Sequence, residues 1–559
     1  YSPSSPSGTF GFGRAFTQGP DPARATAGAG NGLATFLLGL PTSGSLTMDP
    51  ALATQQMYSA GFAQDTFRLS KTVVVEMGMR WEYTSPWKDR FNQLAYFDPD
   101  FVEPSTGLRG MLRFVDKDRR GQTNPDRNNF GPRAGIAWTF MPKMALRAGY
   151  GAFYSQGNGG IGAVSNELGS GFQASTPVYL GPPDPVAFRP PAGATLTNPF
   201  VTGFNIPPSN LLGGTISSTL SRYLTPVNHQ WTASLQRQMT QELLVEAAYS
   251  ASRGMHLWQG YNMNALSTQY LSMGSGLLTQ VPNPFYGKVT TGALSAPTVA
   301  RRQLLSPYPH YSSVNQFRGT IGDSIYHAFT ARIDKRFSHG FSVLASYTAG
   351  KLIDNTGEHF SARTSLSDPN NLGRDRSLAD YDVAQRLVTS AVWQLPFGAG
   401  QRFLNSGIAS RILGGFELNT IAGFQSGFPV VITTPNVTNL PGVSSRAIRL
   451  RSGRLNQGQT PDRYFDTAAF LPADPYTLGT DSRTQPDLRG PGLHNFDFSV
   501  NRSQRIRERA RLQFRAEFFN LFNTPQLDNP DGGVTGRNFG RILGGGGNRV
   551  IQFGLRFAF

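Results

Sequence analysis

The feature that most constrains the fold of this chain is a strict alternation of apolar and polar residues in segments far apart in the sequence. In the last ten residues, VIQFGLRFAF (550–559), Phe553 and Leu555 fall on one face, and Gln552 and Arg556 fall on the other. Successive side chains of a β-strand point to opposite faces. The segment therefore predicts a strand with one apolar face and one polar face.

The same alternation recurs in the segments 72–83, 325–337 and 511–518. In 325–337, His327 and Lys335 are polar exceptions on the apolar face. The inward face of a soluble β-sandwich alternates in the same way. The period alone therefore does not distinguish a sandwich from a membrane barrel.

The lengths of the connections favour the membrane barrel. Short connections are expected at 69–72, 140–143, 239–242, 338–340 and 506–508. Long ones rich in Gly, Pro, Asn and Asp are expected at 18–56, 85–132, 155–227, 253–324, 352–383, 427–493 and 524–547. Short periplasmic turns that alternate with long extracellular loops are typical of outer-membrane barrels.

We therefore predict an all-β fold, an antiparallel transmembrane β-barrel that takes up residues 1–559 as one domain in the cell outer membrane. About 14 strands are expected, the first near residues 9–17 and the last ending at Phe559. Lipid offers no hydrogen-bond partner, so every backbone group must be paired within the sheet. The final strand is expected to pair with residues 511–519.

Charge and composition exclude several other classes of protein. The net charge is +16, from 51 basic and 35 acidic residues, but the arginines are scattered. Scattered cations indicate solvated loops and a polar lumen, and they argue against a nucleic-acid partner. The chain has no cysteine, and its seven histidines lack metal-ligand spacing. We expect neither an enzyme nor a cofactor or metal site.

Charged residues on the polar faces of the predicted strands are the candidate lumen-facing residues. One interpretation is that they guide an anionic or sugar-like solute. The other is that they form ion pairs that stiffen the wall or contact a plug. These residues are Arg80, Glu82, Arg147, Arg332, Arg336, Arg515, Glu517 and Arg556.

Two short motifs suggest other sites. GNGGIG (157–162) has the glycine spacing of a dinucleotide-binding turn. The segment after it is a poor helix, so an outer loop is expected there. DPNNLG (368–373) begins like a calcium loop but has Ala379 where the bidentate carboxylate should stand. An ordinary turn is expected, and calcium binding by the loops stays open.

Several segments resemble the Oar-like TonB-dependent receptors of acidobacteria and their relatives. The most specific match is a C-terminal signature, and the others follow in a consistent order along most of the chain. The segments are GNGLATFLLGLP (30–41), YSAGFAQDTFRLSKTVVVEMGMRWEY (58–83), FGPRAGIAW (130–138), LADYDVAQRLVTSAVWQLPFG (378–398), FDTAAF (465–470) and LRGPGLHNFDFSVNRSQRIRERARLQFRAEFFNLFNTPQLDNP (488–530).

The resemblance implies a barrel of roughly 22 strands closed by an N-terminal plug. The chain is then the C-terminal part of such a receptor, lacking the plug, its TonB-contacting box and the first strands. The final Phe559 resembles the signal read by the barrel-assembly machinery. The implied function is TonB-energised uptake of an unknown bulky solute. A self-closed passive porin and a secreted adhesive β-protein are the alternatives.

Overall fold

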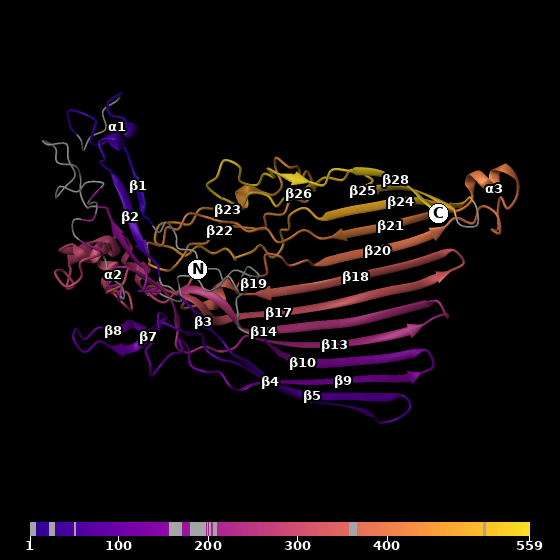
Figure 1. The fold of residues 1–559 in the computed structure, drawn as a ribbon, viewed down its shortest axis with the longest axis horizontal. Helices are drawn as coiled ribbons and strands as arrows, with labels where there is room; N and C mark the ends of the chain where they lie inside the picture. Colours follow the sequence, from indigo (N-terminus) through magenta and orange to yellow (C-terminus); the bar gives the residue numbers. More distant parts are fainter. Residues whose placement is uncertain are drawn as a thin grey trace.

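The computed structural model describes residues 7–21, 28–49, 52–155, 170–178, 197, 200, 203–204, 209–356, 366–506 and 510–559. The GNGGIG motif lies outside these residues. Figure 1 shows long, nearly parallel ribbons that end in tight turns on one side and in large connections on the other. No helix among the described residues is long and apolar enough to cross a bilayer.

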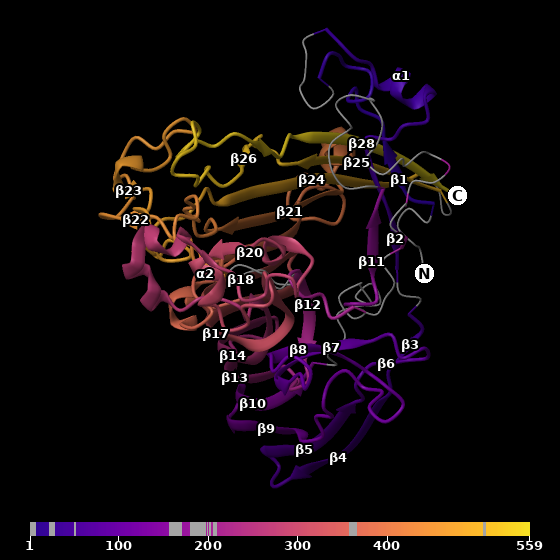
Figure 2. The same ribbon diagram turned by 90° about the vertical axis from the view of Figure 1, so that its left-hand side faces the viewer.

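Within the described residues, thirteen long strands pair antiparallel with their neighbours in chain order and form one sheet. Figure 2 shows this sheet as a curved wall, with β4 at the bottom and β28 at the top. The strands are β4 (Tyr58–Arg68), β5 (Val73–Thr84), β9 (Asn129–Met141), β10 (Met144–Tyr154), β13 (Val227–Gln238), β14 (Leu243–Asn262), β17 (Ser313–Ser338), β18 (Phe341–Asp354), β20 (Gln385–Gln394), β21 (Phe416–Gln425), β24 (Leu493–Arg505), β25 (Arg511–Phe519) and β28 (Val550–Ala558).

The hydrogen-bond register confirms the two-faced character of the strands. Phe514 lies opposite Leu555, and Gln513 lies opposite Arg556, as expected for the last two strands. His327 lies opposite Ala251 on the apolar face, where it is a polar exception. The register repeats from strand to strand, so one face of the wall is mainly apolar and the other mainly polar.

Four predicted short connections join consecutive strands at the same end of the sheet: 69–72, 140–143, 239–242 and 338–340. The fifth, 506–508, lies partly outside the described residues, but the strands on either side of it pair with each other. A longer connection, 395–415, lies at the same end and contains the helix α3 (Gly407–Leu413). The alternation of apolar and polar residues in the strands on either side did not predict this helix.

The prediction that the barrel starts near residues 9–17 is wrong. The strand β1 (Thr9–Gly11) pairs with β2 (Ser43–Met48), which pairs in turn with β11 (Ala174–Pro177). These three strands form a separate small sheet near the loop ends (Figure 1). Phe10 and Phe12 alternate with glycine, but their segment pairs with a loop strand and not with the barrel.

The connections predicted at 85–132 and 253–324 are long, as expected, but they contain secondary structure. β14 and β17 extend into the second of these connections. The hairpin β7 (Ala95–Val102) and β8 (Arg109–Phe114) lies in the first. The strand β12 (Thr215–Leu220) runs parallel to β17 and to β7, and this is an exception to antiparallel pairing.

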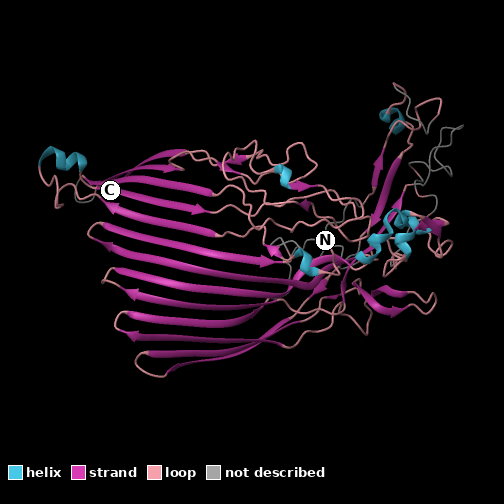
Figure 3. Cartoon of the chain, turned by 180° about the vertical axis from the view of Figure 1, so that it is seen from behind, coloured by secondary structure: helices cyan, strands magenta, loops and turns pink. Residues whose placement is uncertain are grey.

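Two buried clusters stabilise the loop end by removing apolar surface from water. One joins Phe97, Ile216 and Tyr311, and the other joins Phe465 and Leu488. Figure 3 shows the helices gathered mostly at this end. The remaining elements are α1 (Gly32–Leu37), β3 (Thr54–Gln55), β6 (Lys88–Asp89), η2 (Thr268–Leu278), β15 (Gln280–Pro282), η3 (Gly292–Ser295), β16 (Thr298–Ala300), α2 (Arg301–Leu304), η4 (Leu372–Asp375), β19 (Ser377–Leu378), β22 (Ile448–Arg449), η5 (Thr467–Ala469), β23 (Phe470–Leu471), β26 (Gln526–Leu527) and β27 (Gly545–Gly546).

Candidate functional site

The polar face of the wall collects most of the charged residues singled out from the sequence. Following the register from strand to strand places seven of them on the same face: Arg80, Glu82, Arg147, Arg332, Arg515, Glu517 and Arg556. The eighth, Arg336, lies where the register of β17 shifts before its turn. That this face lines a lumen stays a prediction.

Several of these residues form ion pairs with a neighbour two positions along the same strand. Nε of Arg80 lies 2.5 Å from Oε1 of Glu82, and the Tyr58 hydroxyl donates to the same carboxylate oxygen at 2.7 Å. Arg515 pairs with Glu517 in the same way. Such partly exposed pairs contribute little to stability. They do fix the positions of charges along the face.

Three arginines on or near this face carry charges without such a partner. Arg147, Arg336 and Arg556 are exposed, and none makes a side-chain hydrogen bond or ion pair with another residue in the described ranges. An exposed guanidinium has five donors for an acidic or hydroxylated solute. The wall therefore combines neutralised and free positive charges.

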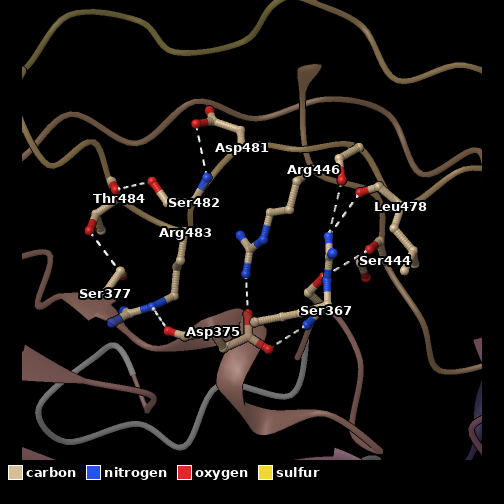
Figure 4. A network of polar contacts seen from close by, with 12 residues as sticks. Ser367, Asp375, Ser377, Ser444, Arg446, Leu478, Asp481, Ser482, Arg483 and Thr484 are labelled. Atoms are coloured by element: carbon tan, nitrogen blue, oxygen red, sulfur yellow. Dashed lines mark hydrogen bonds and ion pairs between the residues drawn. The ribbon is translucent and has the colours of Figure 1, made fainter. Parts of the chain in front are cut away.

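At the loop end, three arginines of the 426–492 connection hold three aspartates near the tops of β18 and β20. We call residues 366–382 and 426–492 the loop platform. Figure 4 shows its centre, where Arg446 reaches the Asp375 carboxylate and the backbone N–H of Ser367 donates to the same carboxylate at 2.9 Å. The other pairs are Arg483 with Asp354 and Arg489 with Asp382.

Neighbouring hydroxyl groups complete this network. The Thr484 hydroxyl bonds to the Ser377 hydroxyl at 3.0 Å and donates to the Leu378 carbonyl at 2.7 Å. Burial raises the pKa of the Asp481 carboxyl, which accepts hydrogen bonds from Gln485 and from the Ser482 backbone. The three paired carboxylates connect the two segments of the platform to each other and to the end of β18.

The DPNNLG motif lies at the edge of this platform. Asp368 is buried, and its Oδ1 accepts the backbone N–H of Asn370 at 2.9 Å, as in an ordinary Asx turn. In the part of the chain that the structure describes, no three His, Asp or Glu side chains cluster in a way that could hold a metal ion. Calcium binding is not proposed for this motif.

A small pocket of about 60 Å³ opens where the loop ends of β5, β12 and β17 meet. Its lining includes the rings of Trp87 and Tyr223, the Asp126 carboxylate and the Arg318 guanidinium. Oδ2 of Asp126 accepts the backbone N–H of Thr225 at 2.7 Å. Aromatic rings beside hydroxyl, amide and carboxylate groups suit a polar solute with a nonpolar face.

The groups of this pocket are held by further contacts. Nε1 of Trp258 donates to the Tyr223 hydroxyl at 3.1 Å, and burial raises the pKa of that phenol. The Arg318 guanidinium lies 4.7 Å from the centre of the Trp258 ring. Sequence reasoning missed this pocket because its lining comes from segments more than two hundred residues apart. No local spacing signals such a site.

Residues 1–552 match the family model described as an outer membrane beta barrel domain. No curated protein sequence matches the chain. The similar solved structures include the pyoverdine outer membrane receptor FpvA from Pseudomonas aeruginosa PAO1, at 9% identity, with a TM-score of 0.40 and coverage of 93% of this chain and 44% of that one.

Two Escherichia coli structures are also similar. The ferric-catecholate import receptor Fiu from K12 has 10% identity, a TM-score of 0.38 and coverage of 92% of this chain and 45% of that one. The outer membrane transporter YddB has 8% identity, a TM-score of 0.39 and coverage of 92% and 53%. The chain thus spans about half the length of these structures.

Proposed function

The chain belongs to the outer membrane beta-barrel domain family, and from this premise we propose that it forms the wall of a TonB-dependent receptor that takes up a bulky solute. Its place in the cell is the outer membrane. The finer assignment to Oar-like receptors of acidobacterial type rests on the sequence resemblance. The solute and the TonB coupling are part of the proposal.

The observation that carries the proposal is the separation of the two faces of one sheet. Phe514 and Leu555 lie on the face suited to lipid, while Arg515 and Arg556 lie on the face suited to water. A wall of this kind lines a polar passage through a membrane. The fixed and free charges on its polar face would contact a solute in transit.

The loop end supplies the second part of the proposal. An ordered surface binds a solute more tightly, because less conformational freedom is lost on binding. The buried ion pairs of the loop platform support the surface at this end from below, and the small pocket beside Trp87 adds a polar recess to it. We place the first contact with the solute there and its passage along the polar face.

The partners of the proposed receptor follow from the resemblance. TonB would act through an upstream plug, and the barrel-assembly machinery would read the final aromatic residue, Phe559. Removal of Phe559 is expected to lower the amount of folded protein in the outer membrane. Substitution by Tyr, which keeps the aromatic ring, is the control.

The test starts with the coding sequence upstream of Tyr1. A plug with a TonB-contacting box supports the proposal, and a signal peptide directly before Tyr1 contradicts it. Solute accumulation by cells that produce the whole gene product is then compared with and without an active TonB. Accumulation that does not depend on TonB would identify a passive porin, and recovery in the soluble fraction would identify a secreted adhesive protein.

A further inference from the structure

The connection between β20 and β21 differs from the tight turns at the same end of the sheet. It contains the helix α3, which Figure 1 shows beyond the strand ends, at the far right of the view. Ile408 and Ile412 are 76% and 57% exposed. They are four residues apart, so they share one face of the helix. Together these two aliphatic side chains form a small apolar surface that a nonpolar neighbour would cover.

Arg502 shows to which side of the wall this helix is attached. The register places Arg502 opposite Phe416 in β21 and Phe514 in β25, so it belongs to the apolar face. An arginine on that face needs protein partners or a route to the membrane surface, because lipid tails offer neither hydrogen bonds nor counter-charge.

Two of the three side-chain hydrogen bonds of Arg502 go to the end of α3, and the third goes to Gln504 on its own strand at 3.3 Å. Its guanidinium donates to the Gly414 carbonyl at 3.2 Å and to the Arg411 carbonyl, and it lies 5.1 Å from the centre of the Phe416 ring. The last carbonyls of a helix carry partial negative charge and lack partners within the helix. Arg502 therefore ties the C-terminal end of α3 to the apolar side of the wall.

We propose that α3 is an interfacial anchor that lies in the inner leaflet of the outer membrane, with Ile408 and Ile412 inserted among phospholipid chains. The short turns mark this end as periplasmic, and the apolar face of the sheet continues directly into the helix through Phe416. Exposed Arg402 and Arg411 stand beside the apolar groups, where anionic headgroups attract cations. A short helix with an apolar face and basic neighbours suits this interface.

The absence of cysteine from the chain makes the test direct. In the variant Ile412→Cys, the introduced cysteine is labelled with an environment-sensitive fluorophore. The labelled protein is placed in nanodiscs of phosphatidylethanolamine and phosphatidylglycerol, which also contain doxyl-labelled lipid as the quencher. Phe553→Cys, on the apolar face of β28, is the lipid-exposed reference, and Ser70→Cys, in a short turn, is the water-exposed reference. We expect at least about twofold more quenching by doxyl lipid at position 412 than at position 70.

The role of Arg502 is tested with the same label. Arg502→Gln in the Ile412→Cys background is expected to weaken lipid quenching at position 412 and leave quenching at Phe553→Cys unchanged. The proposal would be overturned if aqueous iodide quenched the label at position 412 as strongly as at position 70, while doxyl lipid quenched the label at position 553. These discs contain only lipid and this chain, so quenching by doxyl lipid excludes a protein partner as its cause.

Discussion

Arg483, in the connection between β21 and β24, holds the carboxylate of Asp354 at the end of β18, 129 residues earlier in the chain. The two side chains are 3% and 1% exposed. The guanidinium also donates to the backbone carbonyls of Asp354 at 3.1 Å and Leu378 at 3.4 Å. This contact attaches the loop platform to the top of the barrel wall.

Arg483→Met is expected to loosen the loop platform, because it leaves the Asp354 carboxylate buried without its cation. Loss of one partner of a buried ion pair costs about 3–5 kcal/mol. Limited chymotrypsin digestion should then cut within 426–492 at lower enzyme concentration than in the unmodified protein. Arg109→Met is the matched control, since it breaks an exposed pair with Asp100. Equal resistance of both variants would contradict the role of Arg483.

Leu555→Arg and Gln552→Arg place the same charge on opposite faces of β28. The first puts it against lipid, where the expected cost is about 2–4 kcal/mol near the middle of the bilayer. The second puts it on the polar face, where water and the Glu517 carboxylate accept it. The folded fraction, measured by heat-modifiable gel mobility, should fall for Leu555→Arg alone. Equal loss in both variants would contradict the assignment of the faces.

The phenol of Tyr311 is expected to ionise only at high pH. Its hydroxyl donates to the Asn210 carbonyl at 2.9 Å, and burial raises its pKa to about 12. The ordinary value is about 10, so the stability contributed by the buried phenol is present below about pH 10 and is lost as the pH rises through about 12.

The measurement is a titration of tyrosinate absorbance. Tyr311→Phe should remove the part of the rise near pH 12. A Tyr311→Phe curve that differs from the unmodified protein only near pH 10 would show that Tyr311 is accessible to water.

Tyr249→Phe is expected to destabilise the barrel through His327. The two side chains lie on the apolar face and share a hydrogen bond of 2.6 Å. Without the hydroxyl, Nδ1 of His327 has lost this hydrogen-bond partner near lipid. The expected loss of stability is about 1–3 kcal/mol. The temperature of heat modification should fall. Tyr347→Phe removes a hydroxyl from the same face and should leave that temperature nearly unchanged.

The strands and their faces were predictable from the sequence because the barrel imposes a local rule. A membrane strand must alternate along its own length, so the pairing of β25 with β28 and the shared face of Arg80, Arg332 and Arg515 followed from short segments. The polar exceptions His327 and Lys335 were also placed correctly. Their partners, such as Tyr249, come from other strands and have no local signal.

The first strand and the loop end were not predictable, for a different physical reason. Alternation around Phe10 describes a strand but does not say which strand it pairs with. The pairs of Arg446 with Asp375 and of Arg483 with Asp354 join residues 71 and 129 positions apart. The pocket beside Trp87 likewise depends on how distant segments meet. These contacts depend on tertiary packing, which no short pattern records.

The ion pairs of the loop platform have a consequence for how such a protein can change during evolution. Both members of the three pairs Arg446–Asp375, Arg483–Asp354 and Arg489–Asp382 lie within residues 354–489, so an exchange of this whole stretch between related barrels would keep these three pairs together. If recombination between two genes joined them inside this stretch, at least one arginine would come from a different parent than its aspartate. A mismatch there would leave a buried charge without its partner.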